Sequence, residues 1–600
     1  MGKGVKGAAS GEQHENIEMF DAAQQGSYQD RRDMTKDQME DAVRSGSVPH
    51  VNTSEAVDIA KQGGWEVDAL MTEMQNEIDA QGGDHNGHFD LEFANPKYFT
   101  FLIVAFASMG GMLSGLDQSL ISGANLFLPE DLGLNDRQNS LVNSAMSLGA
   151  VGGAIILSPA NEYLGRRWAI ILSCILYTIG GVLEAAAMNY GMIIAARIIL
   201  GFGVGLEGGT VPVYVAETVE RRLRGNMVSL YQFNIALGEV LGYAVAAMFV
   251  TVDGNWRYIL GSSLVFSTIM GIGMLYMPES PRFLMHKGKP VEAFKVWKRI
   301  RGLKTLDSRE EFYVMKMSQE QEDEEVAAGR GSAKYPWMDL FTQPRARRAF
   351  VYANIMIFLG QFTGINAITY FMSTLMQNLG FDKYQSNYMS LVGGGSLLIG
   401  TIPAVLYMER CGRRFWAIST LPVFFIGLII AGASQYAGGQ NAQMGVYLTG
   451  LVIYEIFFGT YACLTWVIPA ESYPTYLRSY GMTTSDGWLF LSSFIVTYNF
   501  TGMSKAMTNI GLTAGFYGGI AFLGFFYQLF FMPETKDKTL EEIDLIFSQP
   551  TSKLVAQNWK NVKETTNDLL RFRFKKVFID AHDAPAVDFS QGKQEVGHQA

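Results

Sequence analysis

The chain has 600 residues, of which 48% are hydrophobic and 17% are charged, and its net charge is −10. The acidic excess lies mainly in residues 1–96, which hold 19 Asp and Glu against 7 Lys and Arg, so it gives no indication of nucleic-acid binding. A soluble protein spreads its charges along the chain, whereas this one has repeated windows of about 20 residues with one ionisable group or none. The composition therefore excludes an ordinary soluble fold and predicts membrane-spanning helices.

The N-terminal tail, residues 1–96, is rich in Gly, Gln, Asp and Glu. Such a composition buries little apolar surface, so we expect the tail to be mostly disordered. Apolar residues at helical spacing around 64–80 indicate one amphipathic helix within it.

Twelve apolar segments follow the tail. They lie at 98–121, 139–160, 168–188, 191–215, 226–250, 257–277, 347–376, 386–408, 415–434, 443–470, 481–503 and 510–532. A polar stretch with helical spacing separates the sixth from the seventh. We therefore divide the chain into an acidic tail, an N-terminal six-helix half, a linker of helices, a C-terminal six-helix half and a C-terminal tail: 1–96, 97–281, 282–346, 347–533 and 534–600.

Basic residues concentrate in the loops that follow the even-numbered segments, and at both ends of the linker. The alternate loops carry only Arg137, Lys383 and Lys505. Because cytoplasmic loops hold an excess of Lys and Arg, both tails and the linker are predicted to be cytoplasmic.

The two halves contain an internal repeat. Gly165-Arg166-Arg167 recurs as Gly412-Arg413-Arg414 after 247 residues. Glu217 and Arg224 recur as Glu471 and Arg478 after 254 residues, and Pro278-Glu279-Ser280 recurs as Pro533-Glu534-Thr535 after 255. An even number of spans separates the copies, so the halves share one orientation in the membrane. Transporters commonly place the substrate between such parallel halves.

These motifs, together with PVYVAETVERRLRG (212–225), GQFTGINAITYF (360–371) and PETKDKTLEEI (533–543), resemble those of the sugar porter family of the major facilitator superfamily. The resemblance covers about 98–545 and implies an all-α membrane protein of twelve helices in two parallel six-helix repeats. It implies a secondary transporter rather than an enzyme, which moves a sugar or polyol by alternating access, has no cofactor and is functional as a monomer in the lipid bilayer. We expect it in the plasma membrane.

Asp117 and Arg197 lie within the first and fourth predicted spans. An ionisable residue inside a membrane is a functional candidate by default. Proton symporters of the family carry an acid and an arginine at the matching positions, so we predict that Asp117 exchanges a proton and pairs with Arg197 when ionised. The alternative is a structural ion pair that only orients helices.

Five residues of the fifth, seventh and tenth spans are predicted to bind substrate: Gln232, Gln361, Asn366, Tyr370 and Trp466. Amides donate and accept hydrogen bonds at once, which suits hydroxyl-rich rings, and an indole offers a flat face to C–H groups. The matching positions contact sugar in related porters. The alternative is that the amides join helices and the indole packs.

The sequence departs from the family pattern at several positions. Gly360 replaces the first of two adjacent glutamines, and Ala462-Cys463 replaces a Gly-Pro pair. The eleventh span is shorter before Trp488, so its polar contact is uncertain, with Asp486 or Trp488 as candidates. Further acids lie within spans: Glu184, Glu207 and Glu239. We expect Glu184 to pair or to lie near an interface, while Glu239, two helical turns after Gln232, either faces the cavity or pairs.

A third group of residues lies at the predicted cytoplasmic helix ends: Glu217, Arg224, Glu471, Arg478, Arg167 and Arg413. Opposite charges there are expected to hold the inner ends together and to separate when the transporter opens inward, since a network can bias a two-state balance. The alternative is charged helix ends at a lipid interface.

No catalytic constellation, metal-ligand spacing or phosphate-binding loop is present in the sequence, which argues against a nucleotide-driven pump. Three functions remain: a proton-coupled sugar or polyol symporter, an uncoupled facilitator with the same site, and a sensor that binds sugar without transport. The Asp117–Arg197 combination favours the first.

Overall fold

A computed structural model of the protein describes residues 64–80, 96–220, 224–327, 336–474, 477–536, 543 and 546–571. Within these residues, eleven helices are long and apolar enough to cross a membrane. A twelfth long helix, α23 (Arg478–Ala506), packs along α7 and α17 but contains many Ser and Thr residues and Asp486. The part of the chain described thus has a helix at each of the twelve predicted spans.

The N-terminal half contains five long helices and one interrupted helix. These are α5 (Pro96–Ala124), α7 (Asp136–Tyr163), α8 (Arg166–Ala185), α9 (Tyr190–Thr218), α10 (Arg224–Phe249) and the pair α11 (Asn255–Gly261) and α12 (Ser263–Leu275), with the short α6 (Leu128–Leu132) after α5. Glycines let these helices approach closely, as small residues do in membranes. A Cβ on Gly115 of α5 would lie 1.9 Å from the Ile235 carbonyl oxygen of α10.

The C-terminal half repeats this plan with one difference. Its helices are α17 (Pro344–Gln361), α18 (Ile365–Tyr370), α19 (Met372–Asn378), α20 (Lys383–Cys411), α21 (Arg413–Ala433), η5 (Ser434–Tyr436), α22 (Gln440–Ser472), α23, the π-helical η7 (Gly511–Tyr517) and α24 (Gly518–Phe531). The segment predicted at 347–376 is not one continuous helix but is interrupted at Phe371, between α18 and α19, and more widely between α17 and α18. Gly364 has a φ of 95° there, and a Cβ on it would lie 2.8 Å from the Tyr517 ring, so only glycine fits.

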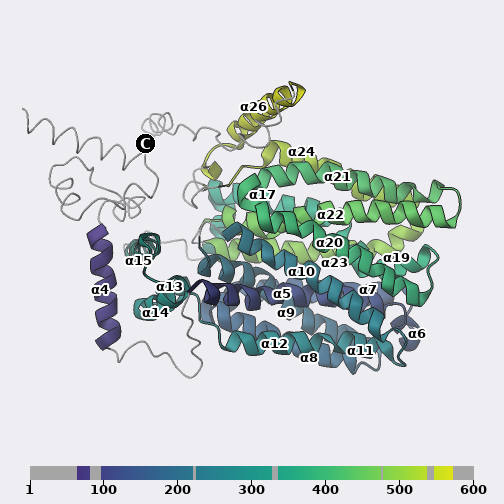
Figure 1. Ribbon diagram of the computed structural model, residues 1–600, viewed down its shortest axis with the longest axis horizontal. Coiled ribbons are helices and arrows are strands. Elements are labelled where there is room, and N and C mark those ends of the chain that lie inside the picture. The colour runs from purple at the N-terminus through teal and green to yellow at the C-terminus, as the bar shows by residue number, and fades with distance from the viewer. Residues whose placement is uncertain are drawn as a thin grey trace, which may run out of the picture.

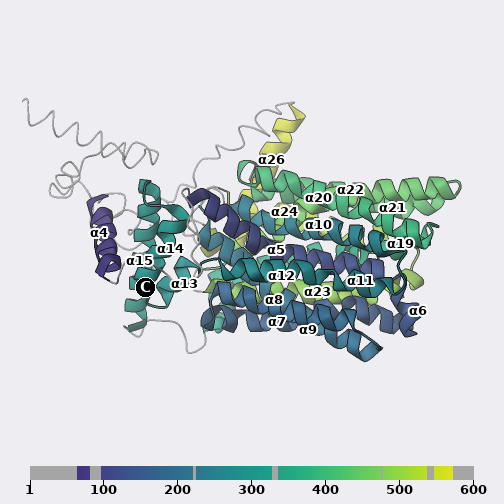
Figure 2. The same cartoon turned by 60° about the horizontal axis from the view of Figure 1, so that its bottom comes forward.

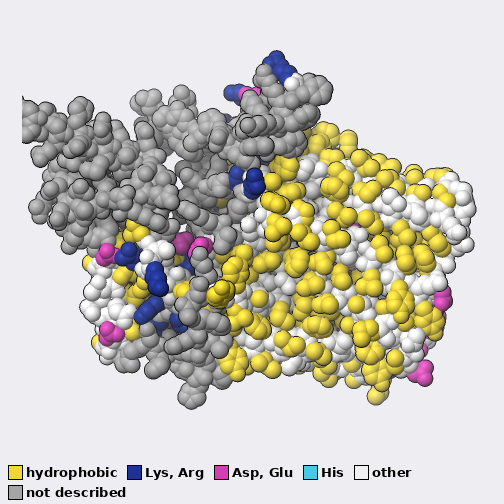
Figure 3. Space-filling model, viewed as in Figure 1, with side chains coloured by type: hydrophobic (Ala, Val, Ile, Leu, Met, Phe, Trp, Pro, Cys, Tyr) yellow, Lys and Arg dark blue, Asp and Glu magenta, His cyan; other side chains and the backbone are white. Residues whose placement is uncertain are grey.

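The two halves lie side by side, and the axes of their long helices are roughly aligned with one another, with successive spans alternating in chain direction (Figures 1 and 2). They meet where α10 packs on α20 and α22, and where α7 packs on α23. Figure 3 shows hydrophobic side chains spread over the outer face of these helices, while charged side chains gather at the ends. This distribution matches a bundle whose sides face lipid.

The linker helices gather at one end of the bundle, on the left of Figure 1: α13 (Pro281–His286), α14 (Pro290–Arg301), α15 (Leu306–Ala327), η4 (Pro336–Met338) and α16 (Asp339–Thr342). The amphipathic helix expected around 64–80 is confirmed as α4 (Gly64–Ala80). It packs on α14 and α15 through buried Val67, Met74 and Ile78, and Asp68 forms an ion pair with Arg309.

The disorder expected for most of the N-terminal tail concerns residues 1–63 and 81–95, which lie outside the described residues. The C-terminal tail beyond residue 571 also lies outside them. Within the C-terminal tail, α26 (Thr551–Leu570) packs against α24. The Asn558 side chain anchors it by donating hydrogen bonds to the Phe530 and Met532 carbonyl oxygens, at 2.8 and 3.1 Å.

Candidate substrate cavity and ion-pair sites

A cavity lies between the two halves, lined by residues of both. Helices α5, α7 and α10 of one half and α17, α18, α20, α22 and α23 of the other contribute to its wall. The polar side chains on the wall are Ser114, Gln118, Ser147, Gln232, Glu239, Gln361, Asn366, Tyr370, Thr465 and Ser493.

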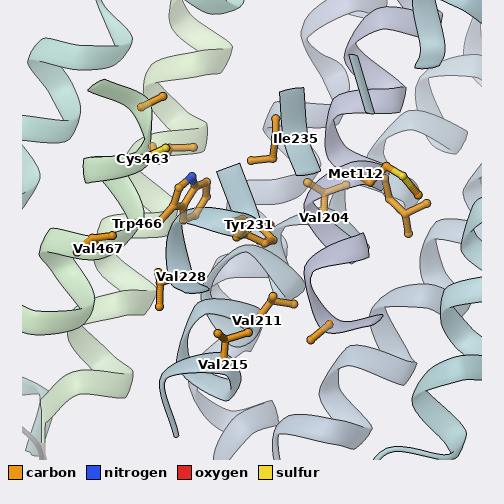
Figure 4. Close-up of a cluster of buried hydrophobic side chains, with 14 of the residues drawn as sticks. Met112, Val204, Val211, Val215, Val228, Tyr231, Ile235, Cys463, Trp466 and Val467 are labelled. Carbon is orange, nitrogen blue, oxygen red and sulfur yellow. The ribbon is translucent and has the colours of Figure 1, made fainter. Parts of the chain in front are cut away.

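The five residues predicted to bind substrate all lie on this wall. Trp466 Nε1 donates a hydrogen bond of 2.8 Å to Gln232 Oε1, which joins the two halves. The Trp466 ring also meets Tyr231 edge to face, with centroids 4.8 Å apart. Figure 4 shows these two rings pointing toward each other from α22 and α10.

The break in the seventh span shapes the other side of the wall. Gln361 ends α17 and Asn366 lies in the first turn of α18, so the turn between the helices brings the two amides together. Asn366 Nδ2 donates a hydrogen bond to Gln361 Oε1. Each amide therefore has a partner within the protein now and retains hydrogen-bonding capacity for a ligand.

Polar contacts link the two halves in the region that runs from the cavity wall to the end of the bundle opposite α13–α15. The Tyr370 hydroxyl lies 3.5 Å from Ser147 Oγ, which is 3.0 Å from Ser493 Oγ. Further out, Asn125 donates to Thr374 Oγ1 at 3.2 Å, and exposed Lys505 forms an ion pair with Asp136. At the other end, Val213 packs with Ala470 and Met482. The halves therefore touch on both sides of the cavity.

Asp117 and Arg197 form a buried ion pair beside the cavity. Arg197 Nη2 lies 2.9 Å from Asp117 Oδ2, and Nη1 lies 3.2 Å from Oδ1, so the contact is bidentate. The two side chains are 2% and 0% exposed. A carboxylate and a guanidinium so far from water are stable only while each compensates the other.

Glu184 has a role that the sequence analysis did not assign to it. Its Oε1 lies 3.0 Å from Arg197 Nη1, and its side chain is 1% exposed, so it is paired within the bundle rather than placed at an interface. The expectation of pairing was right, but its partner is the arginine of the predicted proton site. The hairpin formed by α8 and α9, thirteen residues from Glu184 to Arg197, brings them together.

Other acids of the spans separate into two groups. Glu239 lines the cavity. Asp486 does not, since its carboxylate lies against Gly208 of α9, and Trp488 stacks on Phe358 and is 38% exposed. Neither candidate therefore supplies the eleventh span's cavity contact, which comes from Leu489, Phe490 and Ser493. Glu207 lies outside the cavity wall, against Gly110.

An ion pair lies within the N-terminal half at the end of the bundle that carries α13. Arg166 Nη2 lies 2.9 Å from Glu217 Oε1, and Ser280 Oγ donates to the same carboxylate. Glu279 accepts hydrogen bonds from the backbone N–H groups of Arg166 and Arg167, at 2.9 and 3.1 Å. Burial raises the pKa of the Glu279 carboxyl group, and these hydrogen bonds act in the opposite direction.

The C-terminal half contains the same arrangement. Arg413 Nη2 lies 2.6 Å from Glu471 Oε1, Thr535 Oγ1 donates to Glu471 at 2.8 Å, and Glu534 accepts from the backbone N–H groups of Arg413 and Arg414. The predicted repeat is therefore also a repeat of contacts, and both ion pairs lie within a half rather than between halves.

Arg167 does not take its predicted place in this network. Its guanidinium donates to the Leu275 carbonyl oxygen at 2.5 Å, as Arg414 donates to the Leu529 carbonyl oxygen at 2.8 Å. The physical reason is the helical rotation of about 100° per residue. It turns the first arginine of α8 and of α21 toward the glutamate, and the second toward the end of the last span of the same half, α12 or α24.

The last two predicted network residues are Arg224 and Arg478. The side chain of Arg224 lies outside the described part of the chain. Arg478 lines a small cavity between the halves together with Arg282, Glu217 and Glu471. Charges from both halves thus meet at this end of the bundle.

Comparisons with known proteins agree with the fold. A family model described as "Sugar (and other) transporter" matches residues 103–547. The chain is 65% identical over 550 residues to the myo-inositol transporter FST1 of Gibberella moniliformis, covering 91% of this chain and 96% of that protein. It is 29% identical to the human proton myo-inositol cotransporter, covering 75% and 82%, and 30% identical to the arabinose-proton symporter of Escherichia coli, covering 74% and 92%.

The structure also resembles a solved one. The proton:xylose symporter XylE bound to 6-bromo-6-deoxy-D-glucose matches with a TM-score of 0.66 at 23% identity, covering 76% of this chain and 100% of that chain. That protein belongs to the major facilitator superfamily, so the likeness shows the fold. This chain is therefore a multi-pass membrane protein with the major facilitator fold, and it belongs to the sugar transporter family.

Proposed function

We propose that the protein carries myo-inositol, or a polyol of similar shape, together with a proton by alternating access of the central cavity. The observation that carries the proposal is the cavity itself, in which amides and hydroxyls from both halves lie close to a buried Asp117–Arg197 pair. A relative that is 65% identical is named a myo-inositol transporter, and more distant relatives are named proton cotransporters.

The polar wall suits a ring with a hydroxyl group on every carbon. Gln361 and Asn366 supply donors and acceptors from one half, and Gln232 does so from the other. Trp466 and Tyr370 present ring surface to the C–H groups. In the structure the amides bond to protein groups, and a bound polyol would replace some of these bonds with its own hydroxyls.

Asp117 is the proposed proton carrier and Arg197 is its charge partner. A proton that adds to the Asp117 carboxylate from outside weakens the bidentate contact with Arg197. Substrate binding then favours closure of the outer side, and loss of the proton to the inside restores the contact. The competing role is a structural ion pair whose protonation never changes during transport.

We further propose that the end carrying α13–α15 is cytoplasmic, together with both tails, in a plasma-membrane protein that works as a monomer. The basic residues of the even loops support this orientation. The proposal keeps the predicted division of the chain into N-terminal tail, first half, linker, second half and C-terminal tail, at 1–96, 97–281, 282–346, 347–533 and 534–600. In this orientation Glu217, Glu471, Arg413 and Arg478, with Arg166 in place of Arg167, stabilise the closed inner side.

Uptake of radiolabelled myo-inositol, glucose and xylose into cells that lack their own transporters tests the proposal. We expect myo-inositol to accumulate above its outside concentration, and a protonophore to abolish that accumulation. Uptake that only equilibrates and ignores the protonophore indicates a facilitator. Binding without uptake indicates a sensor, and accumulation of another sugar alone would contradict the substrate assignment.

A further inference from the structure

Arg197 is shared by two carboxylates, and only Asp117 has a place in the proposed transport cycle. Glu184 of α8 and Asp117 of α5 both contact Nη1 of Arg197 in α9, at 3.0 and 3.2 Å. All three side chains are at most 2% exposed. Three different helices of the N-terminal half thus meet at one guanidinium.

The cluster is electrically neutral when one of its two carboxylates carries a proton. With all three groups ionised, the cluster has an excess negative charge in a site without exposed surface, which a membrane interior disfavours. When one carboxylate accepts a proton, the other and Arg197 form a neutral pair. Without Glu184, protonation of Asp117 would leave Arg197 as an uncompensated buried cation, which is strongly destabilising.

Among the described residues, Arg197 is the one cation that acts on both Asp117 and Glu184. The other ionisable groups close to the cluster are Tyr177 of α8 and Tyr370 of α18. Tyr177 donates a 2.9 Å hydrogen bond to the Leu113 carbonyl oxygen, and Tyr370 contacts Ser147. Neither phenol supplies the negative charge with which a carboxylate pairs with Arg197.

We infer that Glu184 is a positioning residue that holds Arg197 in place while Asp117 accepts and carries its proton. This inference rests on the proposed proton coupling through Asp117. Glu184 keeps the guanidinium neutralised and fixed against α8, so that protonation of Asp117 releases α5 from α9 without displacing Arg197. It therefore makes protonation of Asp117 easier than it would be beside Arg197 alone.

The test is the outside pH at which myo-inositol accumulation by purified protein in liposomes is half-maximal, with the inside pH fixed. Glu184→Gln leaves Asp117 as the only counter-charge of Arg197, which favours its ionised form. We expect the midpoint to move toward acid by about 1 to 3 pH units. Glu184→Asp withdraws the carboxylate by one methylene group, so we expect a smaller shift in the same direction.

Glu455→Gln is the matched control. Glu455 of α22 is a carboxyl group that is 1% exposed, and neither of its oxygens has a hydrogen-bond partner among the described residues. Its removal does not touch Arg197, so the midpoint should equal that of the wild type. Should Glu184→Gln fail to fold, Glu184→Asp alone decides, because an unchanged or alkaline-shifted midpoint in it would overturn the inference.

The outcomes separate the inference from the function on which it rests. A wild-type midpoint in folded Glu184→Gln, with proton-driven accumulation intact in the wild type, overturns the role of Glu184 alone. A wild-type protein that exchanges myo-inositol but never accumulates it under a pH gradient overturns the proton coupling, and the inference with it.

Discussion

At the end of the bundle that carries α13–α15, the proposed inner end, the two halves have equivalent contacts, whereas their membrane interiors differ. Arg166, Glu217 and Ser280 are matched contact by contact by Arg413, Glu471 and Thr535. Inside the membrane, only the N-terminal half contains the Asp117–Arg197–Glu184 cluster, and the residue 254 positions after Arg197 is Leu451. The acids of the other half, Glu455 and Asp486, have no hydrogen-bond partner within the described chain.

Under the proposed function, this difference assigns separate tasks to the two regions. Opening and closing needs both halves to move, and the contacts proposed for it are duplicated. Proton coupling needs one exchangeable site, and the residues proposed for it lie in one half. Variants of the cluster should therefore change coupling, while equivalent variants of the inner ends should change stability and the balance between open and closed states.

The largest effect is expected from Asp117→Asn. The amide imitates a protonated carboxyl group and cannot release a proton, so accumulation driven by a pH gradient should fall to that of protein-free liposomes. Exchange of labelled for unlabelled myo-inositol should persist, because Glu184 still compensates Arg197. Accumulation and exchange are measured on the same preparation, with the folded fraction determined by gel filtration. A folded variant that still accumulates myo-inositol at acidic outside pH would contradict the assignment.

The next largest effect compares the two inner ends. Glu471→Gln leaves Arg413, which is 3% exposed, without its carboxylate, and should destabilise the protein by about 3 to 5 kcal/mol. Glu217→Gln should cost less, about 1 to 2 kcal/mol, because Arg166 remains 17% exposed and water can solvate it. Thermal unfolding in detergent measures both. Equal losses of stability, or a larger loss for Glu217→Gln, would show that the deeper burial of Arg413 does not make its ion pair the more important of the two.

A smaller effect is expected in the cavity. Gln361→Ala removes the acceptor of Asn366 Nδ2 and should weaken myo-inositol binding by about 1 to 3 kcal/mol, measured by isothermal titration or by competition with labelled ligand. The control is Gln528→Ala, which removes a more deeply buried amide that forms hydrogen bonds with Tyr352 and Tyr461 outside the cavity. Its affinity should stay unchanged, although its stability falls. If Gln361→Ala binds myo-inositol as tightly as the wild type and Gln528→Ala do, the binding site lies elsewhere.

The smallest effect is expected at the opposite end of the bundle. Lys505 and Asp136 pair across the halves, but their side chains are 64% and 71% exposed. Exposed pairs contribute about 0 to 1 kcal/mol, so Lys505→Ala should change the thermal stability and the transport rate little. A loss comparable to that of Glu471→Gln would show that this end is held as firmly as the inner end.

Sequence reasoning located the elements and most of the residues, because hydrophobic length and the repeat are local signals. It failed where rotation or register decides. Two adjacent arginines carry no information on which one faces Glu217, and the N-terminal turn of α8 settles it in favour of Arg166. Glu184 meets Arg197 only through the register of the α8–α9 hairpin, and the break after Gln361 depends on Tyr517 packing against Gly364.

The cavity was likewise predicted only in part from the sequence. The motif positions of Gln232 and Trp466 indicated that both face one site, yet the hydrogen bond between them spans 234 residues and follows from how the halves dock. Asp486 and Trp488 were candidates because they lie where the eleventh span departs from the family pattern, in the shortened segment that follows Arg478. The rotation of α23 instead turns Leu489, Phe490 and Ser493 toward the cavity.

The most direct test of proton-coupled polyol transport is the pH inside liposomes that contain the wild-type protein and a trapped pH indicator. Myo-inositol is added outside, with equal pH on both sides and the membrane potential clamped. We predict that the interior becomes acidic in step with myo-inositol entry, and that Asp117→Asn abolishes the acidification. Entry of myo-inositol with no change of internal pH would contradict the account.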